Sequence, residues 1–88
     1  MVSLVTGAGR GIGRAIALRL SREGPVAITA RSADQLAETA KLAGGRILVV
    51  PGDIADGAFV KRLVGKVAEA LGDIGLLVNN AGDRKSVV

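Results

Sequence analysis

The sequence of 88 residues contains no cysteine, histidine, tyrosine or tryptophan, and Phe59 is its one aromatic residue. Without cysteine there is neither a disulfide framework nor a cysteine-based metal site. Without histidine the chain lacks the usual general base at neutral pH, which excludes Ser-His-Asp catalysis by these residues. The scarcity of aromatic rings leaves no stacking platform for single-stranded nucleic acid. We therefore expect neither a metal nor a nucleic acid as a partner.

Long hydrophobic runs are also missing, although 49% of the residues are hydrophobic. The apolar stretches are only a few residues long, far short of the ~20 that a membrane-spanning helix needs. Residues 1–5 have no basic region ahead of an apolar run, as a signal peptide would have. We expect a cytoplasmic protein with no membrane partner.

Charge is only modestly unbalanced, because 12 Lys and Arg residues stand against 8 Asp and Glu residues for a net charge of +4. A basic balance suits an anionic partner, which can be a phosphate-bearing ligand, a nucleic acid or a membrane surface. The basic residues are scattered and form no block of five or more, as is typical of a solvated surface. The charge is therefore compatible with a small phosphate ligand and does not indicate a polyanion.

Short apolar runs alternate with amphipathic segments along the chain. Apolar runs bounded by Gly or Pro are typical of buried strands, whereas apolar residues at three- and four-residue spacing indicate helices. The expected strands are 2–5, 26–30, 47–50 and 76–78, and the expected helices are 12–22, 33–42 and 58–71. The unbroken βαβαβαβ alternation predicts a parallel sheet with right-handed crossovers.

Two of these helices carry further expectations. Either Ser32 or Asp34 caps the helix at 33–42, since both residue types favour that position. The helix at 58–71 has five apolar residues that are expected to share one face. They are Val60, Leu63, Val64, Val67 and Leu71.

A glycine-rich turn, residues 6–13, follows the first expected strand and opens the first expected helix. A helix N-terminus offers unpaired N–H groups and a positive dipole end, which favour phosphate. Glycines let the backbone turn tightly and let a diphosphate approach without meeting a Cβ atom. The spacing is T-G-x-x-x-G-x-G, not the commoner G-x-G-x-x-G. The candidate ligand-binding residues here are Gly7, Gly9, Arg10, Gly11, Ile12 and Gly13.

The same turn has a plainer interpretation, in which it is a tight strand-to-helix connection that binds nothing. A glycine motif alone does not decide between the two. The strand expected before the turn and the helix expected after it favour the phosphate-binding interpretation.

Three further segments follow the other expected strands: 30–32 (Ala-Arg-Ser), 53–54 (Asp-Ile) and 79–82 (Asn-Asn-Ala-Gly). Together with the turn at 6–13, and in the same order, they resemble the N-terminal, cofactor-binding half of the short-chain dehydrogenase/reductase family. The resemblance extends through about residue 82.

The resemblance implies a Rossmann-like three-layer α/β fold, truncated relative to the family, with four parallel strands in the order 3-2-1-4 and three helices. It implies a dinucleotide-binding domain at 1–82 and a short tail at 83–88. It also implies that Asp53, followed by Ile54, accepts a hydrogen bond from the adenine amino group. An Asp after Pro-Gly is alternatively a turn-forming residue.

The Asn-Asn-Ala-Gly segment has two implied roles. Asn80, Ala81 and Gly82 would line the ribose side of the cofactor, and Asn79 would mainly tie its strand to the neighbouring strands. Capping of the strand end by the asparagines is the structural alternative, and both can hold together.

The end of the second expected strand bears on the choice between NADP(H) and NAD(H). An acidic residue there binds the ribose hydroxyls of NAD, whereas a basic residue accommodates the 2′-phosphate of NADP. Here Arg31 follows Ala30 and precedes Ser32, and a guanidinium matches a phosphate in geometry and charge. Arg10 is a second candidate for the same phosphate, unless both arginines are ordinary surface residues. We expect NADP(H) in preference to NAD(H).

Catalysis in the family that the chain resembles uses a Tyr-x-x-x-Lys pair, and these 88 residues contain no tyrosine. Catalytic residues are therefore not assigned. The expected function is that of an NADP(H)-binding, oxidoreductase-like protein that reduces carbonyl substrates, and the alternative is a non-catalytic nucleotide-binding or interaction module. A homodimer is expected, through the open apolar edge at 76–78 or through uncovered helix faces.

Overall fold

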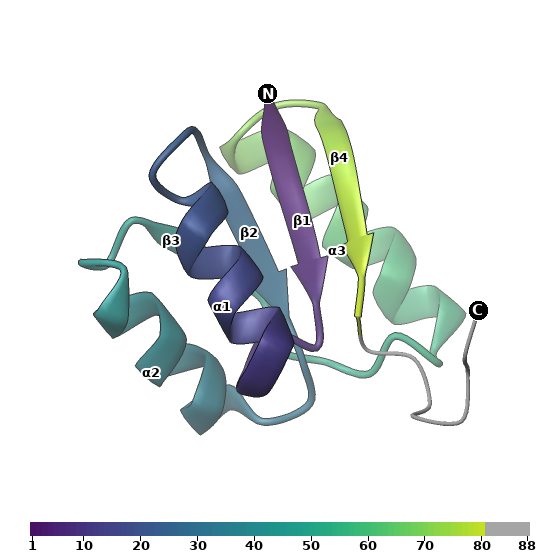
Figure 1. Ribbon diagram of the computed structural model, residues 1–88. Helices are drawn as coiled ribbons and strands as arrows, with labels where there is room; N and C mark the ends of the chain where they lie inside the picture. The colour runs from purple at the N-terminus through teal and green to yellow at the C-terminus, as the bar shows by residue number, and fades with distance from the viewer. Residues whose placement is uncertain (81–88) are drawn as a thin grey trace.

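Four strands form one parallel sheet in the order β3-β2-β1-β4, as the computed structural model shows (Figure 1). The structure describes residues 1–80. The strands are β1 Val2–Thr6, β2 Val26–Thr29, β3 Ile47–Val49 and β4 Ile74–Asn79. The helices are α1 Gly11–Leu20, α2 Ala33–Leu42 and α3 Gly57–Ala70. The expected strand order and the expected number of strands and helices are both confirmed.

The strands are aligned so that their carboxyl ends meet at one edge of the sheet. Thr6, the last residue of β1, is paired with Thr29 of β2 on one side and with Asn79 of β4 on the other. The turns that follow β1 and β2, and the segment after β4, consequently begin next to one another. This edge is where a doubly wound α/β sheet binds its ligands.

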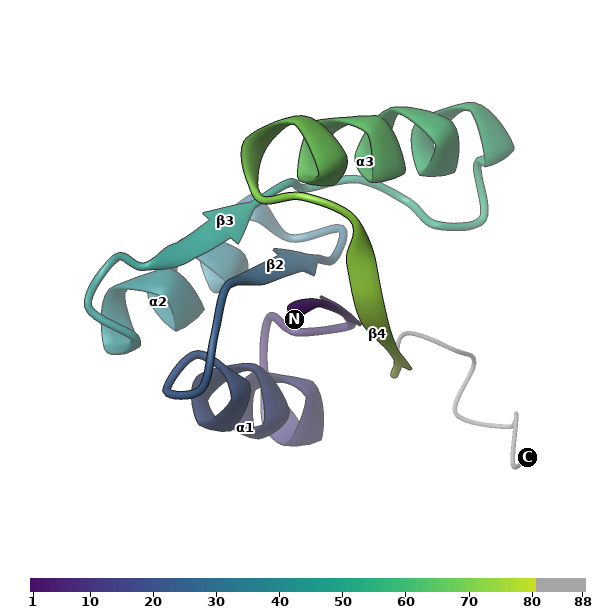
Figure 2. The same ribbon diagram turned by 90° about the horizontal axis from the view of Figure 1, so that it is seen from above.

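The sheet is covered on both faces, by α1 and α2 on one side and by α3 on the other (Figure 2). The first layer packs Ala17 of α1 and Leu36 of α2 against Val5 and Ile28 of the sheet. The second layer packs Phe59, Leu63 and Val67 of α3 against the opposite face. The three layers are thus held by two separate apolar cores. Both are built from aliphatic residues, and the core under α3 also contains the aromatic ring of Phe59.

The interior and edge strands differ in burial in the way their positions require. Every residue of β1 and β2 is buried, because each strand has a neighbour on both sides and helices above and below. In β4 half-buried and exposed residues alternate, and Leu77 keeps 58% of its surface exposed. Strand β4 is therefore an open edge with one poorly covered face among the described residues.

Two sequence-based expectations about the helices need correction. Val64 is 46% exposed, so it does not share the buried face of α3, which is formed by Phe59, Leu63 and Val67 at four-residue spacing. Val64 follows Leu63 directly, and consecutive residues of a helix point about 100° apart. Helix α1 ends at Leu20, two residues before the expected end, and Ser21 is its C-cap.

No helix within residues 1–80 has the length and apolar character needed to cross a membrane.

Candidate functional site

The turn between β1 and α1 has a backbone that only glycine adopts easily. Gly7 has a φ of 64° and Gly11 a φ of 61°, both in the left-handed region. A side chain at either position would be strained by contact with its own backbone. The two glycines reverse the chain at the end of β1 and let α1 start directly at the edge of the sheet.

Gly9 and Gly13 are required for a different reason, the close approach of neighbouring segments. A Cβ atom on Gly13 would collide with the carbonyl oxygen of Gly7 and would lie 2.6 Å from Nδ2 of Asn80. A Cβ atom on Gly9 would lie 2.9 Å from Cβ of Gln35 in α2. Helix α1 is thus pressed against the turn, and the turn against α2.

The N-terminus of α1 lacks a side-chain cap. Its N-cap residue, Arg10, has an extended backbone with φ −162° and ψ 174°, and its side chain makes no capping hydrogen bond. The first turn of α1 contains no acidic residue. The first N–H groups of a helix have no partner within the helix, so at α1 they remain available to an external acceptor such as phosphate.

The other two helices cap themselves. Ser32 accepts a hydrogen bond from the backbone N–H of Gln35 at 3.2 Å, which makes Ser32 and not Asp34 the N-cap of α2. Asp56 accepts from the N–H groups of Ala58 at 3.0 Å and Phe59 at 3.4 Å, which starts α3 one residue earlier than expected. Only α1 presents an open N-terminus among the three described helices.

The two asparagines at the end of β4 tie that strand to β1 and to the turn. The hydroxyl of Thr6 lies 3.1 Å from Oδ1 of Asn79 and accepts the backbone N–H of Asn80 at 2.9 Å. Asn80 also donates from Nδ2 to the carbonyl oxygen of Gly7 at 3.2 Å. Asn79 therefore has the strand-tying contact expected of it, and Asn80 is bound to the glycine-rich turn. Ala81 and Gly82 lie outside the described residues, as does the tail at 83–88.

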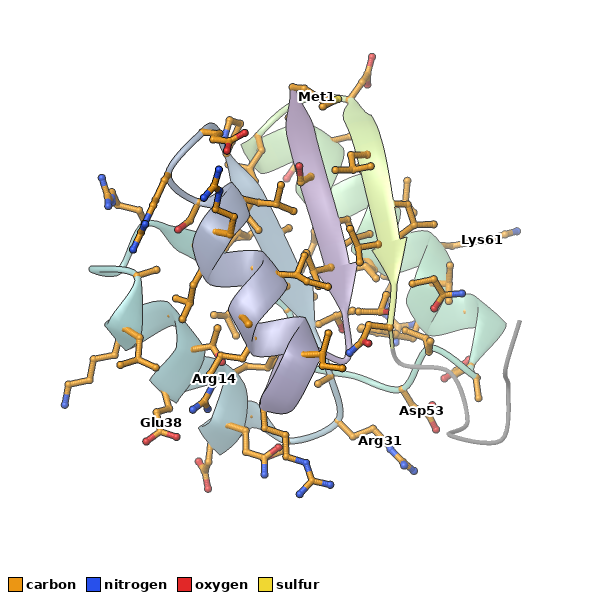
Figure 3. The ribbon with its side chains drawn as sticks, in the orientation of Figure 1. Met1, Arg14, Arg31, Glu38, Asp53 and Lys61 are labelled. Carbon is orange, nitrogen blue, oxygen red and sulfur yellow. The ribbon has the colours of Figure 1, made fainter. Side chains whose placement is uncertain are left out.

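Arg31 follows β2 at the carboxyl edge of the sheet, where its side chain is exposed and points away from the layers (Figure 3). Arg10 is exposed as well. Neither guanidinium forms an ion pair with a described residue, whereas Arg14 and Arg19 each do. Their charges are therefore free to meet an anionic ligand. Ser32 already uses its oxygen as the cap of α2, but its hydroxyl proton remains available as a donor.

Asp53 and Ile54 follow β3, next to the end of β2. One carboxylate oxygen of Asp53 accepts the backbone N–H of Ala55 at 2.9 Å, which is the geometry of an Asx turn. The turn-forming alternative is thus realised. The carboxylate is exposed and keeps a second oxygen, so a further donor can reach it.

Two further residues at this edge were not expected from the sequence, Arg14 of α1 and Thr39 of α2. Thr39 is fully buried, and its hydroxyl lies 2.8 Å from the carbonyl oxygen of Ala8 in the turn. Arg14 reaches from α1 to α2, where Figure 3 shows it beside Glu38, and donates to the carbonyl oxygen of Gly9 at 2.6 Å. A signal for Thr39 exists in the sequence, since it lies three residues after Leu36 on the apolar face of α2.

The assembled edge therefore combines an uncapped helix start, a close-packed glycine turn and exposed arginines. Such an arrangement can bind the phosphates of an extended anionic ligand. Among residues 1–80, no cluster of three or more Asp and Glu side chains is placed to hold a metal ion.

The class of protein follows from this fold and edge, which are those of a nucleotide-binding α/β protein of the Rossmann type. The family described as short chain dehydrogenase matches the chain over residues 1–88. This protein belongs to that family, a family of oxidoreductases.

Individual relatives agree with the assignment. The chain is 41% identical over 83 residues to meso-2,3-butanediol dehydrogenase from Serratia marcescens, covering 92% of this chain and 33% of the relative. A solved structure of actinorhodin polyketide ketoreductase with NADPH superposes with a TM-score of 0.86 at 41% identity, covering 93% of this chain and 33% of that one. L-Sorbose reductase from Gluconobacter frateurii, complexed with NADPH and L-sorbose, gives a TM-score of 0.85 at 37% identity, with the same coverage of 93% and 33%. The chain thus spans about a third of the length of the relatives it matches.

Proposed function

We propose that this chain binds NADP(H) at the carboxyl edge of its sheet and forms the cofactor-binding part of a short-chain oxidoreductase. The observation that carries the proposal is the uncapped N-terminus of α1 behind a glycine turn in which Gly9 and Gly13 have no room for a Cβ atom. Two of the solved relatives are described as complexes with NADPH, which supports the same ligand here.

The residues present fit such a cofactor. The turn residues Gly7, Gly9, Gly11, Ile12 and Gly13, with the backbone N–H groups of α1, would hold the diphosphate. Arg31, with Arg10 and the Ser32 hydroxyl, would hold the 2′-phosphate, which matches a guanidinium in charge and geometry. Asp53 and Ile54 would face the adenine, and Asn80, Ala81 and Gly82 the ribose beyond the diphosphate. Bound NADPH would supply the hydride that reduces the carbonyl carbon of a substrate.

The choice of NADP(H) over NAD(H) is tested by Arg31→Asp. The variant replaces a phosphate-binding cation with an anion, so the dissociation constant for NADPH is expected to rise at least about tenfold, the equivalent of about 1.4 kcal/mol. That for NADH is expected to change less than about twofold. Isothermal titration of both cofactors against the 88-residue chain measures this. Equal affinity of parent and variant for NADPH would refute the assignment to Arg31.

Binding and catalysis are separable. The 88 residues contain no tyrosine, so the proposal assigns cofactor binding, not proton transfer, to this chain. The second candidate function is accordingly a nucleotide-binding or interaction module without catalysis. Following NADPH absorbance with a panel of aldehydes, ketones and quinones separates the two, because only a reductase consumes the cofactor.

Self-association belongs to the same proposal. Strand β4 is an open edge, and Leu77 on β4 and Val64 on α3 are large apolar residues left exposed among the described residues. Such surfaces favour pairing with a second copy. We expect a homodimer in the cytoplasm, through β4 or an uncovered helix face. A monodisperse monomer in light scattering at micromolar concentration would contradict the dimer.

A further inference from the structure

We infer that Arg14 and Thr39 are positioning residues that fix the backbone of the glycine-rich turn in the orientation needed to bind a diphosphate. The inference rests on the proposed function for its ligand, and on the contacts of these two side chains for its mechanism. Neither residue is part of the glycine motif. Arg14 lies on α1 and Thr39 on α2, and both side chains contact carbonyl oxygens of the turn.

Thr39 is the buried half of this arrangement. Its side chain is completely inaccessible, and its hydroxyl has three carbonyl oxygens within reach: Ala8 at 2.8 Å, Gln35 at 3.1 Å and Gly9 at 3.4 Å. The contact with Gln35, four residues back in α2, is the common one for a threonine inside a helix. The shortest contact is instead with Ala8 in the turn, so the hydroxyl binds α2 to the turn backbone.

Arg14 is the charged half. Its Nε donates to the Thr39 hydroxyl at 2.9 Å, and its Nη2 donates to the Gly9 carbonyl oxygen at 2.6 Å. The same Nη2 lies 3.0 Å from a carboxylate oxygen of Glu38, which neutralises the charge at the edge of the network. The side chain of Arg14 is only 22% exposed. A planar guanidinium with several fixed donors suits such a multiple contact better than a lysine would.

The position of Arg14 in its own helix makes this use of the side chain more specific. It is the fourth residue of α1, near the positive end of the helix dipole, where a cation is disfavoured. Its hydrogen bonds lead away from α1, to the turn and to α2. The arrangement is therefore explained by what the side chain holds and not by the stability of α1.

The consequence for the turn follows from peptide geometry. In a planar trans peptide, the carbonyl of one residue and the N–H of the next point in opposite directions. When Thr39 holds the carbonyl of Ala8, and Arg14 that of Gly9, the N–H groups of Gly9 and Arg10 are turned away from α2. No acceptor for these two N–H groups is found among residues 1–80. The carbonyl oxygens of Ala8 and Gly9, which would repel a diphosphate, are thus directed away from it. The N–H groups of Gly9 and Arg10 are held in place as donors before the ligand binds.

Two substitutions and one control test the inference. Arg14→Met keeps the length of the side chain and removes its donors, and Thr39→Val keeps the shape of the buried side chain and removes the hydroxyl. The control is Arg19→Met, which removes an arginine from the same helix that is 73% exposed and, among residues 1–80, pairs only with Glu23. If Arg14→Met fails to fold in thermal melts, Thr39→Val decides the outcome.

The first measurement needs no ligand. Backbone ¹⁵N order parameters of Gly9, Arg10 and Gly11 are expected to fall from about 0.85, typical of a rigid backbone, to below about 0.7 in Arg14→Met and Thr39→Val. Arg19→Met is expected to leave them unchanged. Unchanged order in a folded Thr39→Val and Arg14→Met overturns the inference, and this outcome does not depend on the proposed function.

The second measurement separates positioning of the turn from general stability. NADPH, which carries a diphosphate, is expected to bind about tenfold more weakly to Arg14→Met, because preorganisation of the turn is lost. Adenosine 2′-monophosphate, which has no diphosphate, is expected to change by less than about twofold. Equal losses for both ligands, or an unchanged NADPH affinity, overturn the inference. If the parent chain itself fails to bind NADPH, the proposed function fails, and the order parameters still decide the role of Arg14 and Thr39.

Discussion

The N-termini of α1 and α3 differ in what satisfies their first backbone N–H groups. At α3, Asp56 accepts two of them, at 3.0 Å and 3.4 Å. At α1, the N-cap position is occupied by Arg10, whose side chain accepts none. A side-chain cap contributes about 1 kcal/mol to folding, so α3 gains a stabilisation that α1 forgoes.

The difference separates a helix start that is capped within the fold from one that, under the proposed function, binds a ligand. The two N–H groups of α3 that Asp56 accepts are used within the chain. Those of α1 lie behind the glycine turn, beside Asn80 and the Arg14–Thr39 pair, and within residues 1–80 no side chain caps them. The proposed cofactor site is thus the one helix start where the described chain provides no side-chain cap. The variants below are ordered from the largest expected effect to the smallest.

Gly13→Ala tests the closest contact at the start of α1, the one between Gly13 and the turn. A Cβ atom there would collide with the Gly7 carbonyl oxygen, and backbone cannot move aside as a flexible side chain can. We expect a loss of about 3 kcal/mol in the free energy of unfolding, at the upper end of what overpacking usually costs. Urea denaturation followed by circular dichroism measures it.

The matched control for Gly13→Ala is Gly65→Ala in α3. A Cβ atom at residue 65 meets nothing within 4 Å, so this substitution is expected to stabilise the helix by up to about 1 kcal/mol. A Gly13→Ala protein as stable as its parent would contradict this expectation, because α1 and the turn would then have to move apart at no cost in free energy.

Arg10→Asp would convert the start of α1 into that of α3. The backbone at residue 10 is already extended, so an aspartate there can accept the N–H groups of the first turn. We expect folding to gain about 0.5–1 kcal/mol and the NADPH dissociation constant to rise at least about tenfold. Thermal melts and calorimetric titration measure the two changes. Arg10→Ala isolates the loss of charge, and equal NADPH affinity in both variants would mean that capping is irrelevant to binding.

The reciprocal control, Asp56→Ala, removes the cap of α3. It is expected to reduce the free energy of unfolding by about 1 kcal/mol. The NADPH dissociation constant is expected to change by less than about twofold, since Asp56 lies outside the proposed site. If Asp56→Ala both lowers the free energy of unfolding and weakens NADPH binding more than about twofold, the proposed difference in role between the two helix starts is wrong.

Most of the fold could be predicted from the sequence because its signals are local. Short apolar runs marked all four strands, and the alternation with helices specified parallel pairing. Boundaries were less accurate. Strand β4 begins at Ile74, not residue 76, because Gly75, a poor strand former, obscured a pairing that links Val2 to Ile74. Such pairing is decided by the neighbouring strand and not by the segment itself.

The residues of the candidate site could be predicted only where they belong to a recognisable sequence motif. The glycine turn and Asn80, both identified from motifs that resemble the family, lie side by side, with Asn80 bound to Gly7. Arg14 and Thr39 were missed because their role depends on how α2 packs against the turn. These two residues form a hydrogen bond but are 25 positions apart in the sequence, so no local pattern links them. Whether Ser32 or Asp34 caps α2 was likewise left open, since both have the right chemistry and only the backbone decides.

The position of β1 in the middle of the sheet has a consequence for the order of folding. It comes first in the chain among the four described strands, yet Leu4 pairs with Ala27 on one side and with Leu77 on the other. Strand β1 can pair with β2 early during synthesis, whereas its pairing with β4 requires nearly all of the described chain to be synthesised first. Such distant pairing slows folding and leaves a strand edge open in the meantime. The nascent chain is therefore expected to be most dependent on protection from aggregation just before β4 emerges.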